Sequence, residues 1–241
     1  MLRVVLLLPF FSLFLSCGKT DFDFVNKGVP GDNIADLHKR VQQDVLAFSP
    51  DWVIIMIGTN DCLNSKKFIA AEQFQQQLDH LIKRLQKNDL NIILVAPPTV
   101  DAAYLLERHD RKLYPVPPND KLELYAQIIK QVATQHQLPF IDIFQQFKQL
   151  GVPQHNQDSL IQNEANSGVP DGVHPTAAGH KVIAQFIFDE ISNNSSVPLE
   201  GKVICFGDSN TYGWNVEGAG SSEGQTWPAF LKAMLDGTAK N

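Results

Sequence analysis

The segment KVICFGDSN, residues 202–210, decides the fold. It begins as a short apolar run, and a glycine, an aspartate and a serine follow directly. A run that is apolar on both faces is typical of a parallel strand buried between two layers of helices. A second run, WVIIMIGTN at residues 52–60, also ends in a glycine followed by polar residues. Both segments therefore predict strands of a parallel sheet whose carboxyl ends carry polar side chains.

Strands and helices alternate around these two segments. Strands are expected at 22–25, 52–57, 91–96, 139–143 and from 202, and helices at 33–47, 68–86, 121–135, 176–191 and 227–235. This alternation predicts an α/β fold, a three-layer α/β/α sandwich around a five-stranded parallel sheet, with ligands bound at the carboxyl ends of the strands. The polar stretch at 192–201 has the composition of a linker, but one domain over 21–241 is the better interpretation.

Composition narrows the class of protein. The chain has 241 residues, of which 44% are hydrophobic and 19% charged, as expected of a globular domain. A formal charge of −6 and the lack of basic runs give no reason to expect nucleic acid as a partner. Cys17, Cys62 and Cys205 form no CxxC pair and no metal-ligand spacing, so neither a disulfide framework nor a metal site is expected. Cys62 and Cys205 are expected to be buried.

The N-terminal segment 1–20 is expected to direct export. Arg3 precedes a nearly apolar run at 4–15, which as a helix would span about 18 Å, against ~30 Å for a bilayer core. The residues before Cys17, Phe-Leu-Ser, resemble a bacterial lipobox, and a lipidated Cys17 would tether the protein to the cell-envelope membrane. A cleaved signal of a periplasmic or secreted protein and an ordinary buried segment are the alternatives.

Two polar motifs contain a serine and a histidine suited to nucleophilic catalysis. In Gly207–Asn210 the serine, Ser209, can lie at a helix N-terminus, where free backbone N–H groups stabilise developing negative charge. In the Asp-Gly-Val-His motif, His174 can act as a general base, while Asp171 fixes its tautomer and stabilises the imidazolium. For each motif taken alone, an ordinary turn is the alternative. The other six histidines have no such partner in the sequence and are interpreted as solvated or structural.

Two further motifs offer hydrogen-bond donors. In Gly58–Asp61, the amide of Asn60 can donate to an oxyanion. After the strand at 22–25, Gly31 can present an unobstructed backbone N–H, with Asp32 or Asn33 capping the next helix. A plain turn or cap is the alternative for both motifs.

Together the four motifs resemble the blocks of the SGNH (GDSL) hydrolase superfamily, over nearly all of residues 22–241. Trp227-Pro228 and the following helix resemble its thioesterase and arylesterase branch. The resemblance implies that Ser209 is the nucleophile and His174 the base oriented by Asp171. It also implies an oxyanion hole formed by the backbone N–H groups of Ser209 and Gly31 and the Asn60 side chain, with no metal or organic cofactor.

The order of the blocks departs from that family. Its members begin with the serine strand, whereas here this strand follows the Asp–His motif. Placing 202–241 before 21–191 restores the order and gives a flavodoxin-like sheet with a crossover between every pair of strands. The chain is therefore expected to be circularly permuted, with 192–201 joining the ancestral termini, which often lie close together in compact domains.

The expected function is hydrolysis of a small carboxylic ester or thioester through an acyl-enzyme, by a monomer. Acetylated carbohydrates and short aryl esters are among the candidate substrates. The alternative is a non-catalytic, carbohydrate-binding lipoprotein of the cell envelope that retains the fold. No phosphate-binding glycine motif follows any strand, which argues against a nucleotide-binding protein. The stretch 101–120 either forms a wall of the substrate pocket or is a surface insertion. Because the strand at 22–25 starts at the opposite edge, lipidation of Cys17 would turn the catalytic edge away from the membrane.

Overall fold

The computed structural model describes residues 22–194 and 197–238. The expected export segment and Cys17 lie outside the described residues. No helix within these two ranges is both long and apolar enough to cross a bilayer.

A five-stranded parallel sheet forms the centre of the fold, as the alternating pattern predicts. Its strands are β1 (Asp23–Gly28), β2 (Trp52–Met56), β3 (Asn91–Ala96), β4 (Phe140–Asp142) and β5 (Lys202–Gly207). They lie in the order β1-β5-β2-β3-β4, and each neighbouring pair is parallel. When β5 is counted first, this becomes 2-1-3-4-5, the order of flavodoxin-like sheets. The last strand of the chain thus occupies an interior position.

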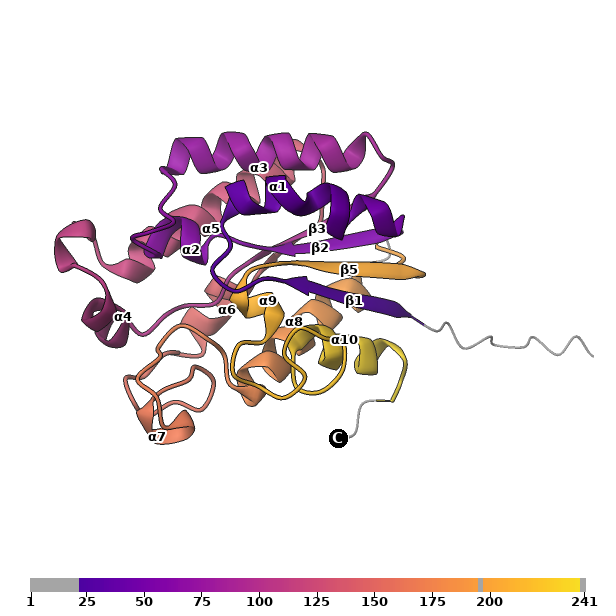
Figure 1. The fold of residues 1–241 in the computed structure, drawn as a ribbon. Coiled ribbons are helices and arrows are strands. Elements are labelled where there is room, and N and C mark those ends of the chain that lie inside the picture. Colours follow the sequence, from indigo (N-terminus) through magenta and orange to yellow (C-terminus); the bar gives the residue numbers. More distant parts are fainter. Residues whose placement is uncertain (1–21, 195–196, 239–241) are drawn as a thin grey trace, which may run out of the picture.

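Helices cover both faces of the sheet and make the three predicted layers (Figure 1). One face is covered by α1 (Ile34–Asp44), α3 (Ala71–Gln86) and α5 (Pro118–Gln135), and the other by α6 (Ile143–Gln149), α8 (Ala177–Asn193) and α10 (Trp227–Leu235). Successive residues of a strand point to opposite faces. Accordingly, Val53 and Ile55 join the core beneath α1, α3 and α5, whereas Ile54 and Met56 join the core beneath α8 and α10. This two-sided burial explains the continuous apolar runs.

Most long helices and strands begin and end near the predicted residues. The structure also contains short helices that the sequence did not predict. The helix expected from 68 begins at Ala71, and the one expected from 121 begins at Pro118, since proline is well tolerated in the first helical turn. The additional elements are α6, α2 (Thr59–Leu63), α4 (Ala102–Arg108), α7 (Glu164–Ser167), α9 (Ser209–Tyr212) and the 3₁₀ turns η1 (Leu46–Phe48) and η2 (Arg111–Leu113). A helix of one or two turns shows too little periodicity to be predicted from sequence.

The carboxyl ends of β1 and β5 meet closely beneath α9. Gly28 pairs with Gly207 in the register of the two strands. A Cβ atom on Gly28 would lie 2.1 Å from the backbone nitrogen of Tyr212, so only glycine lets β1 approach α9 this closely. At the other end of the sheet, the backbone N–H of Phe22 lies 3.4 Å from a carboxylate oxygen of Asp236. The start of β1 and the end of α10 are therefore neighbours.

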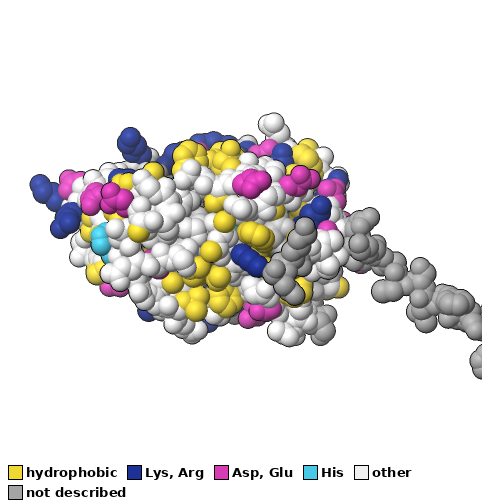
Figure 2. Space-filling view, turned by 90° about the horizontal axis from the view of Figure 1, so that it is seen from below, with side chains coloured by type: hydrophobic (Ala, Val, Ile, Leu, Met, Phe, Trp, Pro, Cys, Tyr) yellow, Lys and Arg dark blue, Asp and Glu magenta, His cyan; other side chains and the backbone are white. Residues whose placement is uncertain are grey.

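The surface below the sheet is weakly charged. Viewed from this side, a group of hydrophobic side chains lies near the middle beside one basic side chain, and most other acidic and basic side chains lie toward the edges (Figure 2). Figure 1 places α7, α8 and α10 in this layer, with the loop that follows α9. Uncharged ligands are therefore compatible with this side of the molecule.

Candidate active site

Ser209 is placed by the sharp turn from β5 into α9. A Cβ atom on Gly207 would lie 2.3 Å from the Met56 carbonyl oxygen, so glycine is required where the strand turns. The next residue, Asp208, is the N-cap of α9 and accepts a hydrogen bond of 2.8 Å from the Asn210 N–H. Ser209 is consequently the first residue of α9, at the carboxyl edge of the sheet.

Ser209, His174 and Asp171 form one hydrogen-bonded chain. Nε2 of His174 lies 2.9 Å from Oγ of Ser209, and Nδ1 of His174 lies 2.8 Å from Oδ2 of Asp171. The Asp171 carboxylate accepts the Nδ1 hydrogen, which leaves Nε2 free to accept the proton of the serine hydroxyl. The three residues singled out in two separate motifs thus meet in one place.

The carboxylate of Asp171 is held in its ionised form. Burial by itself would raise its pKa, but the His174 side chain and the backbone N–H groups of His174 and Val173 donate to it and lower the pKa to about 2. The guanidinium of Arg108 lies 3.7 Å from the same carboxylate. Asp171 is therefore a fixed negative charge behind the imidazole ring at neutral pH.

Gln162 joins the loop of His174 to the loop after α9, and no sequence motif marks it. Its backbone N–H donates to the His174 carbonyl oxygen at 2.8 Å. Its side-chain amide donates to the carbonyl oxygens of Pro175 and Trp214, both at 2.9 Å. Because Gln162 is fully buried, these bonds are shielded from water and keep the two loops in register.

The glycine loop after β1 supplies a free backbone donor. Gly31 has a φ of 82°, a value that favours glycine, and neither its N–H nor that of Ser209 donates to any group in the described residues. Of the two expected caps, Asn33 caps α1, whereas Asp32 pairs with Arg40 at 2.6 Å. Arg40 also donates to the Gly207 carbonyl oxygen at 2.8 Å and so ties this loop to the end of β5.

Asn60 lies on α2, beside both of these loops. Its Nδ2 atom is 3.0 Å from the Asp32 carbonyl oxygen and 3.3 Å from Oδ2 of Asp208. Its own side-chain oxygen accepts a bond of 3.0 Å from Asn64, which fixes the orientation of the amide. Asn60 lines the same cavity as Ser209 and His174.

Two buried carboxyl groups lie behind this cavity. Burial raises the pKa of Asp61 to about 7 and that of Asp208 to about 6, although each accepts a backbone hydrogen bond. Asp61 accepts the N–H of Ile34 at 2.8 Å, which anchors the start of α1 to α2. These side chains support the loops around the cavity from within the protein.

The cavity at Ser209 and His174 is small, about 170 Å³. Leu105, Arg108 and His109 line its outer side, so the stretch 101–120 does form a wall of this cavity. A second cavity of about 140 Å³ lies alongside and shares Leu63 and Asn64 with it.

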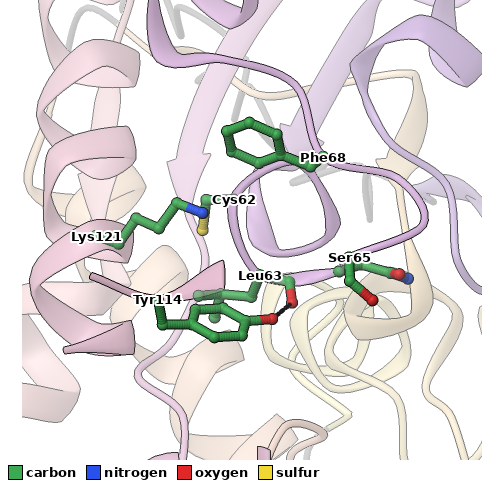
Figure 3. Close-up of a pocket in the computed structure, with 7 residues that line it drawn as sticks. Cys62, Leu63, Ser65, Phe68, Tyr114 and Lys121 are labelled. Atoms are coloured by element: carbon green, nitrogen blue, oxygen red, sulfur yellow. Dashed lines mark hydrogen bonds between the residues drawn. The ribbon is translucent and has the colours of Figure 1, made fainter. Parts of the chain in front are cut away.

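Aromatic side chains and one lysine define this second cavity (Figure 3). The ammonium group of Lys121 lies 4.2 Å from the ring centre of Phe68 and 5.4 Å from that of Tyr114. The Tyr114 hydroxyl donates to the Leu63 carbonyl oxygen, which joins the wall formed by 101–120 to α2.

Two expectations about side chains outside the site can be checked directly. Cys62 and Cys205 are buried and unpaired, as expected. Of the remaining histidines, which are interpreted as solvated or structural, two have an acidic partner in the fold. His136 lies 2.7 Å from Asp79, and His155 lies 2.8 Å from Asp101. Both pairs join residues more than 50 positions apart, so the sequence pattern does not reveal them. No cluster of three metal-ligating side chains occurs in 22–194 or 197–238.

Comparison with known proteins identifies the family. The model of the GDSL-like lipase/acylhydrolase family matches residues 15–182. The chain belongs to this family. An acetylxylan esterase of Geobacillus stearothermophilus is 28% identical over 69% of this chain and 71% of its own length. An uncharacterized lipoprotein of Bacillus subtilis, YqeF, is 24% identical over 70% and 73%.

Solved structures agree with this assignment. A crystal structure of the Geobacillus esterase superposes with a TM-score of 0.54 and 27% identity, over 70% of this chain and 72% of that chain. Structures described as catalytic mutants of that esterase replace a serine, an aspartate or a histidine with alanine, the last two lying three positions apart. The α/β fold with its parallel sheet and the assignment as a carboxylic ester hydrolase are thus shown.

Proposed function

We propose that this protein removes acetyl groups from carbohydrates through an acyl-enzyme formed on Ser209. The observation that carries the proposal is the continuous hydrogen-bonded chain from the Ser209 hydroxyl through His174 to Asp171. A hydroxyl bonded to an imidazole, which is in turn oriented by a carboxylate, is the arrangement required for nucleophilic acyl transfer.

In the first half of the proposed reaction, Oγ of Ser209 attacks the ester carbonyl carbon. The hydroxyl proton moves to Nε2 of His174, and the carbonyl electron pair moves to the oxygen. When the tetrahedral intermediate collapses, the carbon–oxygen bond to the sugar breaks, and His174 returns the proton to the departing alcohol. The negative charge of Asp171 stabilises the imidazolium between these two transfers.

In the second half, water replaces the sugar. His174 accepts a proton from the water as its oxygen attacks the acetyl-serine carbonyl, and then donates this proton to Oγ of Ser209. Acetic acid leaves and the serine hydroxyl is restored. In both halves the oxyanion would accept hydrogen bonds from the free N–H groups of Ser209 and Gly31. It would also accept a hydrogen bond from the side-chain amide of Asn60. Of the two hydrogen bonds that this amide donates, the one to Asp208 is the longer, at 3.3 Å, and is therefore the one that the oxyanion would replace.

The size of the cavity supports a short acyl group. A space of about 170 Å³ that also admits part of the alcohol leaves little room for a long chain. The relatives named acetylxylan esterases point to the same substrate class.

We expect p-nitrophenyl acetate to be hydrolysed with a kcat/KM at least tenfold above that of the octanoate, since even one methylene group that a pocket does not accommodate costs about 1–3 kcal/mol. A chain-length series from acetate to octanoate measures this, with release of acetate from acetylated xylan assayed in parallel. A maximum at octanoate would reject the proposed acyl group while leaving the esterase assignment intact.

We propose further that the chain is circularly permuted relative to other members of its family. The interior position of β5, which makes the sheet order 2-1-3-4-5 when it is counted first, supports this rotation. The family match ends at residue 182, before β5, as expected when a comparison in sequence order meets a rotated chain. The contact between Phe22 and Asp236 also supports the rotation, because the start of β1 lies beside the end of α10.

A chain rotated back should therefore fold. Such a protein would begin at Val197, run to Thr238, continue through a short glycine–serine linker to Phe22, and end at Asn194. We expect its melting temperature to stay within about 5 °C of the wild-type value and its activity within about threefold. Every strand and crossover is retained, and reclosing a surface loop costs little free energy. Thermal unfolding and p-nitrophenyl acetate turnover measure both. As a control, a protein whose new termini lie inside α5 should not fold. If the protein that begins at Val197 also did not fold, this result would count against the permutation.

We also propose that the protein is exported and tethered through Cys17. The lipobox-like sequence before Cys17 and the lipoprotein relative support this. Because β1 is parallel to β5, Phe22 lies at the edge of the sheet opposite Ser209. A tether at that edge would turn the catalytic cavity toward soluble or cell-wall esters.

A further inference from the structure

Trp214 is an exposed aromatic side chain beside the catalytic histidine. Its side chain keeps 45% of its surface accessible, and its ring centre lies 6.0 Å from that of His174. The chain contains three tryptophans, and the other two, Trp52 and Trp227, are buried. A large aromatic surface left in water next to a reacting group is typical of a recognition site.

The backbone of Trp214 is fixed at both of its polar groups. Its N–H donates to the Ser209 carbonyl oxygen at 3.1 Å, and its own carbonyl oxygen accepts the amide of the buried Gln162 at 2.9 Å. The indole is thus attached to the loops that carry Ser209 and His174. An aromatic surface presented by a fixed backbone loses little conformational freedom when a ligand stacks on it.

A largely uncharged polar groove begins at Asn215, the residue that follows Trp214. It has a volume of about 470 Å³ and lies between the loop after α9, α7 and the start of α8. Glu217 is the only charged residue that lines it; the others are amide, hydroxyl and small apolar side chains. Asn215 and Thr176, which follow Trp214 and His174 closely in the chain, both line the groove, so it starts at the edge of the catalytic loops.

Part of the hydrogen-bonding capacity in this groove is unused. No hydrogen bond within the described residues engages the side chain of Gln225 or that of Ser159, and the side-chain oxygen of Asn215 accepts none. Amides and hydroxyls both donate and accept, which matches the hydroxyl groups around the edge of a sugar ring. The face of a sugar ring is made of C–H groups and matches an exposed indole.

We propose that Trp214 and this groove bind the neutral oligosaccharide that carries the ester, with one sugar stacked on Trp214 and the following sugars in the groove. This inference rests on the proposed function and extends it, because it assigns the part of the substrate that is not cleaved. The low charge of the lining selects against nucleotides and acidic glycans, which would need cationic partners.

Kinetics with substrates of different length separate this subsite from the catalytic machinery. We expect kcat/KM for acetylated xylo-oligosaccharides to rise from one sugar to four. In Trp214→Ala, KM for the tetrasaccharide should rise roughly tenfold, while kcat/KM for p-nitrophenyl acetate stays within about twofold. Trp214→Tyr should restore most of the tetrasaccharide affinity, because a flat aromatic ring remains. Leu124→Ala, an exposed apolar side chain on α5, serves as the matched control.

A binding measurement without turnover provides a second readout. Since Trp214 is the one exposed tryptophan, titration of Ser209→Ala with unacetylated xylotetraose should change its fluorescence in a saturable way, and Trp214→Tyr in the same background should abolish the change. Gln225→Ala should weaken binding of the tetrasaccharide and leave binding of the monosaccharide unchanged.

The outcomes distinguish the inference from the function on which it rests. A wild-type protein without activity on p-nitrophenyl acetate would overturn the proposed function. With that activity intact, kcat/KM independent of oligosaccharide length, or an equal loss on both substrates in Trp214→Ala, would overturn the oligosaccharide subsite. An equal loss would mean that the indole acts on His174 instead of on the sugar.

Discussion

Replacing Ser209 with alanine is expected to lower kcat for p-nitrophenyl acetate by about a millionfold, the scale of losing a serine nucleophile in hydrolases of this chemistry. Among the described residues, the hydroxyl is the only group bonded to Nε2 of His174, at 2.9 Å, so the variant has no atom there to carry the acyl group. KM should change little, because the cavity walls remain. Initial rates at enzyme concentrations high enough to detect residual turnover measure the effect.

Covalent labelling makes this prediction specific. A fluorophosphonate probe should modify wild type at Ser209, as mass spectrometry of the labelled peptide would show, and should not modify Ser209→Ala. Ser192→Ala, an exposed serine on α8, should behave as wild type. Residual labelling of Ser209→Ala, or equal turnover by both proteins, would reject Ser209 as the nucleophile. A wild-type protein that neither reacts with the probe nor turns over p-nitrophenyl acetate would favour the non-catalytic carbohydrate-binding alternative.

The fold was largely predictable because burial gives long strands and helices a recognisable pattern of apolar residues. In β2 and β5, contact with helices on both faces makes nearly every position apolar, and such runs are visible without any structure. The short helices α2 and α9 leave no such mark, since their positions are fixed by tertiary contacts. The first residue of α9, for example, is set by the Asp208 cap and the close packing at Gly207.

The candidate site was predictable where residues stand at strand ends, and not where they act across the fold. Ser209, His174, Asp171 and Asn60 follow strands or lie in short motifs, so parallel topology brings them to one edge. Arg40 lies in the middle of α1, yet it binds the end of β5, and Gln162 lies in an irregular segment, yet it joins two loops. Their partners are distant in sequence, and a single sequence contains no signal for such pairs.

Replacing Asp171 with asparagine is expected to lower kcat by about four orders of magnitude while keeping the fold. The carboxylate accepts the Nδ1 hydrogen of His174 and thereby directs the lone pair of Nε2 toward Ser209. An asparagine amide can instead donate to Nδ1, which places the ring hydrogen on Nε2 and removes the acceptor that Ser209 needs. The loss thus comes from the wrong tautomer as well as from the lost charge.

The pH dependence of this variant tests the electrostatic part of the argument. Hydrogen bonds lower the pKa of Asp171 to about 2 against the effect of burial, so its charge is complete above about pH 4. Its contribution to stability should then be constant above pH 4 and disappear as the pH falls through 2, because the folded state binds the carboxyl proton less tightly than the unfolded state.

The free energies of unfolding of wild type and Asp171→Asn, measured at pH 3 and at pH 7, should accordingly differ less from each other at pH 3. Asp120→Asn, an exposed carboxyl on α5, should reproduce the wild-type values. An Asp171→Asn variant with full activity would show that His174 is oriented without its carboxylate partner. An equal difference in unfolding free energy at pH 3 and pH 7 would show that the charge of Asp171 does not contribute to stability.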